Sequence, residues 1–279
     1  MTLYTIAYNG YGKFLEEWCK NAVNQTTKPS KIIIVLGENH GADRQILKKI
    51  IGKMPYDIIY SDAKTMGGLR NAAVRKIEGW SLYFSADDIL LPNAIQEIMK
   101  YQKYDAVALR YIERSISGIE KKKESAVIKI KDVMQWSKFL IPAYIAVKEP
   151  QRFLNIEIPN YPFLFELAKQ KKKITLTDNE CAIYVRREGS HGDIAKQKQL
   201  WRQYKEQLNE YATNYTTKYI QKQGNVKIKV IKSFIDITNN QRRRKGEIFE
   251  ATSDRALDLI IKKQKCILEE WLDESITKI

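Results

Sequence analysis

The sequence predicts an α/β fold, in which a mostly parallel sheet is flanked by helices and followed by a small C-terminal α+β module. Up to about residue 185, short apolar runs alternate with segments of helical periodicity, the order typical of a parallel sheet. Gly224 then interrupts a long polar helix pattern, and strand patterns follow it. Hydrophobic residues make up 44% of the chain and charged residues 29%, which excludes a disordered protein.

The first half of the chain supplies four predicted strands separated by helices. The clearest strand is KIIIVL, at 31–36, which is rich in β-branched residues and bounded by Pro29 and Gly37. Between strands, apolar residues such as Leu15 and Trp18 recur at helical spacing. We expect strands at 3–8, 31–36, 57–60 and 81–85, and helices at 12–25, 42–53 and 69–78.

The second half adds a β-rich insertion at 113–148 and a long polar helix. A turn at Gly118 and a basic tip indicate a hairpin inside the insertion. We expect helices at 94–101, 160–172 and 194–219 and strands at 105–112, 126–130 and 182–185. The tail at 226–267 is expected to form a strand, a basic turn, a strand and a helix capped at Thr252 or Ser253.

The charge is the least ordinary property of the chain. Its 48 basic and 33 acidic residues leave a net charge of +15, which favours polyanionic partners such as nucleic acid, anionic lipid or acidic glycan. The three cysteines are scattered along the chain, so we do not expect a disulfide framework. With only two histidines, a zinc site is not expected either. No apolar run approaches the ~18 residues of a membrane span, and no signal peptide precedes the first strand, so we expect a cytoplasmic protein.

The most informative segment runs from Gly67 to Pro92. It is predicted to form a glycine turn, a helix, a buried strand and then two adjacent carboxylates, Asp87 and Asp88, at the strand end. In α/β folds, ligands bind at the carboxyl ends of strands, and paired carboxylates suit a hard divalent cation with a phosphorylated ligand. The alternative is a strand-end aspartate followed by an aspartate that caps the next helix.

Four segments in this order resemble the family-2 glycosyltransferases of the GT-A fold: TIAYN, NAVNQTTKPSKIIIVLGE, GGLRNAAVRKIEGW and LYFSADDILLP. The resemblance covers roughly residues 2–100 well and 150–192 more weakly. It implies a transferase domain at 1–192, with a nucleotide-sugar half at 1–112 and an acceptor half at 113–192. A connecting helix at 193–223 and a small module at 224–279 would follow.

The resemblance also implies roles for individual residues. Asp87, with Asp88 beside it, would be catalytic and would hold Mn²⁺ or Mg²⁺, and His191 would complete the metal coordination unless it is an exposed loop histidine. Arg70 could clamp phosphate or be a surface arginine, and Glu38 could accept a hydrogen bond from uracil or be an exposed carboxylate. The positions that correspond to donor-binding positions of the family are Ala7, Tyr8, Asn9, Glu38, Arg70, Asn71, Ser85 and Ala86.

Two positions depart from the family pattern. Ser85 replaces the first acid of the DxD motif, and Asn160 falls where the family has its general base. An amide cannot take a proton, so Glu157, Glu166 or Asp178 would have to substitute, with Glu157 as the principal alternative base. The departures also leave room for a non-catalytic protein on this fold.

The tail resembles a small module of phage proteins, through Phe234, Asp236, the Lys245–Gly246–Glu247 turn and the residues that follow. With the net charge, this favours a phage-encoded enzyme in the host cytoplasm. It would move a sugar, by inversion, from a UDP-sugar to a modified (hydroxymethylated) base in DNA. One alternative acceptor is a bacterial surface polysaccharide or lipid-linked sugar; a second alternative function is a non-catalytic nucleic-acid-binding relic of the fold.

Overall fold

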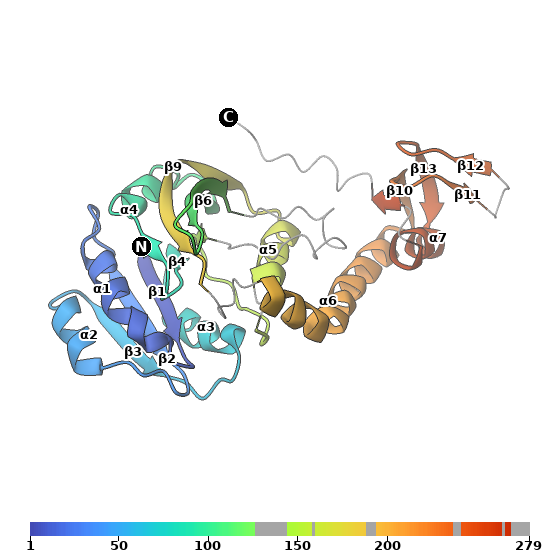
Figure 1. Cartoon of the computed structure of the whole chain (residues 1–279). Helices are drawn as coiled ribbons and strands as arrows, with labels where there is room; N and C mark the ends of the chain where they lie inside the picture. Colours follow the sequence, from blue (N-terminus) through green and yellow to red (C-terminus); the bar gives the residue numbers. More distant parts are fainter. Residues whose placement is uncertain (126–143, 158–159, 188–193, 237–240, 264–265, 269–279) are drawn as a thin grey trace. The chain divides into compact units, whose positions relative to one another are not determined.

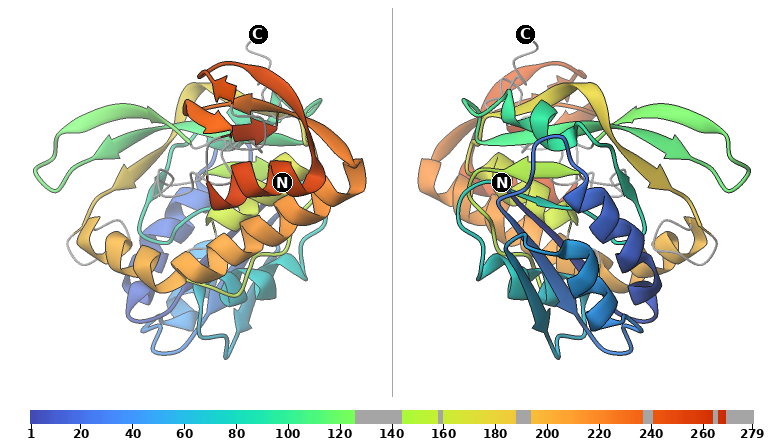
Figure 2. Two further views of the ribbon diagram at one scale, coloured as in Figure 1. Left: turned by 90° about the vertical axis from the view of Figure 1, so that its right-hand side faces the viewer. Right: turned by 90° about the vertical axis from the view of Figure 1, so that its left-hand side faces the viewer.

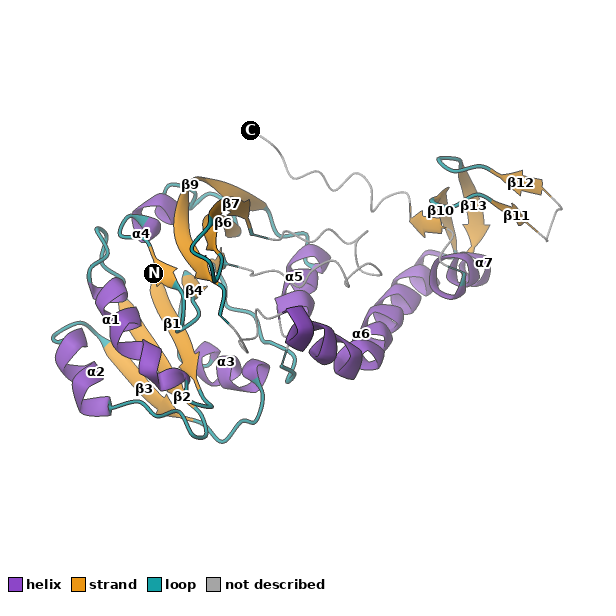
Figure 3. Ribbon diagram, viewed as in Figure 1, coloured by secondary structure: helices purple, strands orange, loops and turns teal. Residues whose placement is uncertain are grey.

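The computed structural model describes residues 1–125, 144–157, 160–187, 194–236, 241–263 and 266–268. In this part, the chain forms two compact units, the first ending at Arg202 and the second starting at Gln203. The helix α6 (Ile194–Gln223) begins in the first unit and continues into the second. Each unit has its own sheet (Figures 1 and 3).

The first unit is built on a parallel half-sheet whose strands are ordered β3-β2-β1-β4. Its strands are β1 (Thr2–Ala7), β2 (Lys31–Leu36), β3 (Tyr56–Tyr60) and β4 (Ser81–Tyr83). The sheet continues through β8 (Ile145–Val147), β6 (Ala106–Arg114), β9 (Ile174–Val185) and β5 (Ile89–Leu90). The strand β8 is antiparallel to β4 and β6, whereas β6 and β9 are parallel. The expected α/β sheet is therefore confirmed, with antiparallel strands in its second half.

Alternating side chains of the central strands supply two apolar cores. Leu3 of β1 and Ile32 of β2 pack on the side covered by α1 (Leu15–Val23), α2 (Arg44–Ile51) and α4 (Ala94–Met99). Ile6 and Ile33 pack on the other side, against α3 (Met66–Val74). Because side chains of a strand alternate between faces, one apolar strand can serve both helical layers (Figure 1). A single 3₁₀ turn (Tyr11–Phe14) and α5 (Asn160–Lys169) complete the described helices of this unit.

Several predicted boundaries were wrong. The fourth strand ends at Tyr83 and is followed by a turn and the short β5, so Asp88 does not cap α4, whose N-cap is Asn93. The predicted glycine turn is the first turn of α3, because the Thr65 hydroxyl accepts a hydrogen bond from the Gly68 backbone and starts the helix early. The last strand, predicted at 182–185, begins at Ile174. The strand expected at 126–130 lies outside the described residues.

The expected hairpin around Gly118 is present. It joins β6 to β7 (Glu120–Glu124), and both views of Figure 2 show it extending away from the rest of the first unit. Among the described residues, no helix is both long enough and apolar enough to cross a membrane.

The second unit has a three-stranded antiparallel sheet, ordered β13-β10-β14, and a separate hairpin of β11 and β12. Its small core includes Val226, Ile228, Ala251, Ala256 and Leu259. The helix predicted after Thr252 is present with Thr252 at its N-cap position, although the Thr252 side chain makes no capping hydrogen bond. The tail contains more strands than predicted. Its elements are β10 (Asn225–Val230), β11 (Phe234–Asp236), β12 (Gln241–Arg243), β13 (Ile248–Thr252), α7 (Ser253–Leu257), a π-helical turn (Asp258–Lys262) and β14 (Cys266–Leu268).

Candidate active site

Asp87 lies in the turn that follows β4, at the carboxyl edge of the parallel strands. Its Oδ1 accepts a 2.6 Å hydrogen bond from the Ser85 hydroxyl, and its Oδ2 lies 3.2 Å from a guanidinium nitrogen of Arg187. The Asp87 side chain is 11% exposed, so a ligand can still reach it. Ligands of open α/β sheets bind at this edge, which makes Asp87 the centre of the candidate site.

Asp88 points the opposite way, into the core. The Tyr144 hydroxyl donates a 2.6 Å hydrogen bond to one of its carboxylate oxygens, and the Val185 backbone N–H donates a 3.0 Å bond to the other. Burial, and next the negative charge of Asp87, raise the pKa of Asp88 well above its usual range. Asp88 therefore ties the β4–β5 turn to the end of β9, and this placement favours a positioning role over contact with substrate.

Arg187, a residue that sequence reasoning did not single out, lies beside Asp87. Besides Asp87, its guanidinium donates a 3.1 Å hydrogen bond to the Val185 carbonyl and lies 4.8 Å from the centre of the Phe14 ring. The signal in the sequence is a pair of arginines directly after a predicted strand, four residues before the His191 that the resemblance pointed to. His191 lies outside the described residues.

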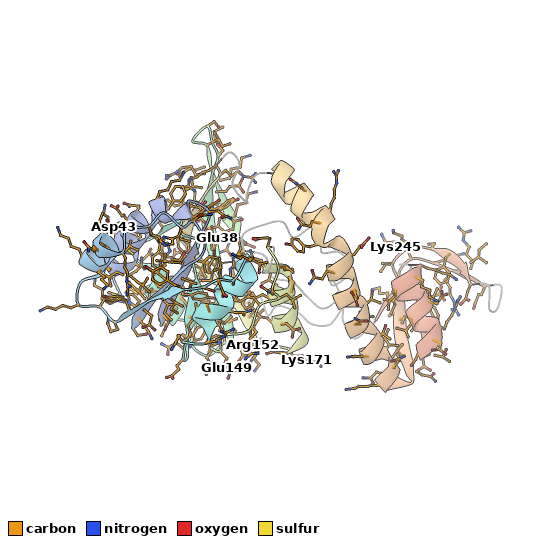
Figure 4. The ribbon with its side chains drawn as sticks, turned by 90° about the horizontal axis from the view of Figure 1, so that it is seen from below. Glu38, Asp43, Glu149, Arg152, Lys171 and Lys245 are labelled. Atoms are coloured by element: carbon orange, nitrogen blue, oxygen red, sulfur yellow. The ribbon has the colours of Figure 1, made fainter. Side chains whose placement is uncertain are left out.

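The residues expected at the nucleobase lie together at the neighbouring strand ends. The Asn9 N–H donates to the Glu38 carbonyl at 3.0 Å, and the Gly37 N–H donates to the Ala7 carbonyl at 2.8 Å. Asn9 has a φ of 48°, a left-handed conformation that turns the chain back after β1. The Glu38 side chain (labelled in Figure 4) is exposed and pairs with Lys64 at 2.7 Å, which lowers its pKa.

Tyr8, which immediately follows β1, connects this region to the segment before α5. Its hydroxyl donates a 2.8 Å hydrogen bond to Glu157, whose carboxylate also accepts a 3.4 Å bond from the Met66 N–H at the start of α3. Burial and the Glu157 carboxylate raise the pKa of Tyr8. Glu157 thus lies beside a helix N-terminus, where a carboxylate is stabilised.

Arg70 is buried and 3% exposed, instead of reaching out from the surface of α3. It donates a 2.6 Å hydrogen bond to the Asn160 side-chain oxygen, and its guanidinium lies 3.5 Å from the centre of the Tyr83 ring. Asn71 makes two hydrogen bonds, of 2.9 and 2.8 Å, with the backbone of Phe153. These contacts favour positioning roles for Arg70 and Asn71, which fix the segment before α5 against α3.

The remaining predicted positions are divided between the site and the interior. Ala7 and Ala86 are buried, at 0% and 3% exposure, so only their backbone can meet a ligand. Asp178 is near α4, where its N–H donates to Tyr101 and Glu97. Val185 lies seven positions further along the same strand, roughly 20 Å away, so Asp178 does not belong to the Asp87 site.

The donor set around Asp87 fits a hard divalent cation in part. The Asp87 carboxylate and the Ser85 hydroxyl supply oxygen ligands, which Mg²⁺ and Mn²⁺ prefer. Asp88 does not fit, since both its oxygens are engaged in the core. Within the described segments, no group of three or more His, Cys, Asp or Glu residues could hold a metal. A cation here would take further ligands from substrate phosphates and water, as Mg²⁺ commonly does.

With this geometry in place, the chain can be compared with known proteins. No protein-family model and no curated protein matches it. Solved structures do match: S. aureus TarS 1-349 in complex with UDP-GlcNAc has a TM-score of 0.57 and 14% identity, over 77% of this chain and 66% of that chain. The complex of TarS 1-349 with UDP gives a TM-score of 0.51 at 13% identity, over 66% of this chain and 60% of that one. The TarS 1-349 structure without a named ligand gives 0.50 at 14%, over 79% and 80%.

This likeness shows the fold. The chain has the mixed α/β architecture of GT-A glycosyltransferases, with a curled central sheet flanked by helices, as the sequence predicted.

Proposed function

We propose that this protein is a glycosyltransferase that uses a nucleotide-sugar donor. The observation that carries the proposal is the placement of Asp87 and Arg187 at the carboxyl edge of β4, on a GT-A-type sheet. The strand-end residues Tyr8, Asn9 and Glu38 lie at the same edge and would contact the nucleobase. TarS, which has a similar fold, is named in complexes with UDP-GlcNAc and UDP, and this supports a UDP-sugar as donor.

In the proposed reaction, the sugar–phosphate bond breaks and negative charge develops on the departing diphosphate. Asp87, with Ser85, would hold Mg²⁺ or Mn²⁺, which supplies several kcal/mol of charge stabilisation when bound. Arg187 would turn from Asp87 to donate charge-assisted hydrogen bonds to the phosphate oxygens. Asp88 and Tyr144 would keep the turn in register, because they connect it to the end of β9.

We propose Glu157 as the general base for the acceptor hydroxyl. Asn160 has no basic group, and its oxygen is committed to Arg70 at 2.6 Å. Glu157 is a carboxylate held beside the site by Tyr8 and the start of α3. A base acting directly on the acceptor is the arrangement expected of an inverting transferase.

The proposed acceptor is a hydroxymethylated base in phage DNA, modified in the host cytoplasm. The net charge of +15 supports a polyanionic acceptor. A base inside a duplex would have to be flipped out to reach Asp87 and Glu157. The alternative acceptors are a surface polysaccharide or a lipid-linked sugar, and a panel that includes these compounds distinguishes them.

The donor site is tested by thermal shift with UDP-, GDP- and dTDP-sugars, with and without Mn²⁺. A ligand that binds the native state raises the melting temperature according to its concentration and affinity. We expect one donor class to stabilise the protein, more strongly with Mn²⁺, and to be hydrolysed slowly without acceptor. Asp87→Asn should lose the Mn²⁺-dependent part of the shift. No shift and no hydrolysis with any donor would overturn the proposal and favour a non-catalytic protein.

A further inference from the structure

We propose that the second unit carries a site for the phosphodiester backbone of duplex DNA, formed by Lys232, Arg242, Arg244 and Lys245. This rests on the proposed function, because it assigns the DNA contact of that enzyme to particular residues. Lys245 is labelled on the unit in Figure 4. All four residues are exposed.

The backbone brings Lys232, Arg244 and Lys245 to the open end of the β11–β12 hairpin, and Arg242 lies one residue further in, opposite Ile235. Phe234 of β11 faces Arg243 of β12 at that end, so Lys232 precedes one strand and Arg244 follows the other. The Lys245 N–H donates a 2.9 Å hydrogen bond to the Ser233 hydroxyl. The next residue, Gly246, donates a 2.8 Å bond to the Val230 carbonyl, which fixes one turn against the other.

The acidic residues near this cluster, Asp236 and Glu247, form ion pairs with two other arginines. The carboxylate of Asp236, 3% exposed, lies 2.5 Å from a nitrogen of Arg255 and 3.7 Å from Arg243. Glu247 pairs with Arg243 at 2.5 Å and accepts a hydrogen bond from the Arg244 backbone N–H, and Arg243 lowers its pKa. The Arg243 guanidinium also lies 4.1 Å from the centre of the Phe249 ring, so it is fixed inside the unit.

The four outer cations have no such partners among the residues that the structure describes. Within the described residues, the side chains of Lys232, Arg242, Arg244 and Lys245 make no ion pair and no hydrogen bond. The described residues around them therefore do not cancel their positive charge, and two hydrogen bonds hold the turn that carries Lys245. A repeating phosphate polymer matches such a cluster, because each phosphate can meet one lysine or arginine and release its condensed counterions.

The test measures binding of the full chain to a fluorescent 30-base-pair duplex at several salt concentrations. The variant changes all four residues to glutamine. The matched control changes Lys48, Lys49, Lys53 and Arg75, which are exposed on the first unit, to glutamine, so that both variants lose four charges. Each lost phosphate contact lowers the log–log salt slope by about 0.9, so the test variant should lose about 3 to 4 units of slope and the control less than about 1.

Unchanged DNA binding in the test variant would overturn the inference, because the four residues would then make no phosphate contact. Equal losses in test and control would also overturn it, because overall charge and not this cluster would then govern binding. Duplex DNA is also added as a competitor to the protein bound to heparin. Failure of the DNA to displace heparin would overturn the inference, because it would indicate that the site binds another polyanion. Donor hydrolysis without DNA is measured on every variant. If hydrolysis is absent throughout while the DNA result holds, the proposed function has failed and the DNA site has not.

Discussion

Asp87 and Asp88 are neighbours in the sequence, but their carboxylates face different surroundings. Asp87 is partly exposed and shares its oxygens with Ser85 and Arg187, whereas Asp88 is buried against Tyr144 and the Val185 backbone. We therefore expect the two adjacent carboxylates to have different roles: Asp87 faces the proposed ligand, and Asp88 stabilises the turn through its hydrogen bonds in the core. The two substitutions below separate these roles.

We expect Asp87→Asn to lower turnover by at least ~100-fold, because about 3 kcal/mol of transition-state stabilisation corresponds to that factor. The melting temperature should change by no more than ~2 °C, since the side chain is partly exposed and keeps a polar partner. Donor turnover and a thermal melt on the same sample measure both quantities. Parental turnover in this variant would remove Asp87 from the mechanism.

Asp88→Ala should act mainly on stability. It leaves the Tyr144 hydroxyl and the Val185 N–H without their partner in the core, at a cost of about 2 to 4 kcal/mol in the free energy of unfolding. Urea denaturation measures this difference. A variant as stable as the parent would show that the buried carboxylate does not connect the two segments.

Asn160→Asp tests whether the family's base position is open in this protein. A carboxylate introduced there would lie beside the buried Arg70 guanidinium, 2.6 Å from the present amide oxygen, and would form an ion pair with it. An ion-paired aspartate is a poor base, so we expect no gain in turnover, while Glu157→Gln lowers it. The measurement is kcat/KM of each variant as a function of pH. A kcat/KM of Asn160→Asp that is tenfold above the parent would assign the base to this position.

At the scale of elements, the sequence predicted the strands and helices of the first half well, because each has one clear signal. The strand predicted at 31–36 has the correct bounds at both ends, because Pro29 and Gly37 flank a run of β-branched residues. The early part of β9 was not predictable because it is polar. Thr177 and Asn179 interrupt the apolar pattern at a bulge, where Asn179 donates hydrogen bonds to Glu97. A contact between residues so far apart in the sequence cannot be predicted from the local pattern of either segment.

The same limit applies to the site. Asp87 was predictable from a strand-end motif, and so were the residues at the ends of β1 and β2. The interior position of Arg70 was not, because it depends on Tyr83 and Asn160, which are distant in the sequence. Arg187 lies beside Asp87 because β9 ends at the β4–β5 turn, where Asp88 accepts a hydrogen bond from the Val185 N–H across almost a hundred residues.

The glycines that open α3 give an element-scale prediction. A Cβ added at Gly67 would lie 1.8 Å from the Leu154 carbonyl oxygen. One added at Gly68 would meet the end of the Asn155 side chain at 2.4 Å and, less severely, the Ala63 Cβ at 2.9 Å. Both Gly→Ala changes gain similar helix propensity, about 1 kcal/mol. Since backbone cannot move aside as a side chain can, Gly67→Ala should destabilise by about 2 kcal/mol or more and Gly68→Ala distinctly less. Equal stabilities in urea would contradict the close approach of segment 154–156 to α3.

At the scale of the whole molecule, two units with separate cores predict two unfolding transitions. The first core includes Leu82, fully buried in β4, and the second depends on Asp236 between Arg243 and Arg255. Leu82→Ala removes apolar contacts worth about 2 to 5 kcal/mol. Asp236→Ala removes the buried carboxylate that joins Arg243 to Arg255, which then keep only Glu247 and Asp258, at a cost of about 1 to 3 kcal/mol.

Because neither substitution touches the other core, each should lower the midpoint of one calorimetric transition and leave the other within about 1 °C. Donor binding adds an independent assignment, since a nucleotide sugar bound near Asp87 should raise only the transition that Leu82→Ala lowers. A single transition that shifts with both substitutions would mean that α6 couples the two units into one cooperative structure. The DNA contact would then be expected to respond to donor binding, and the salt titration repeated with donor measures that response.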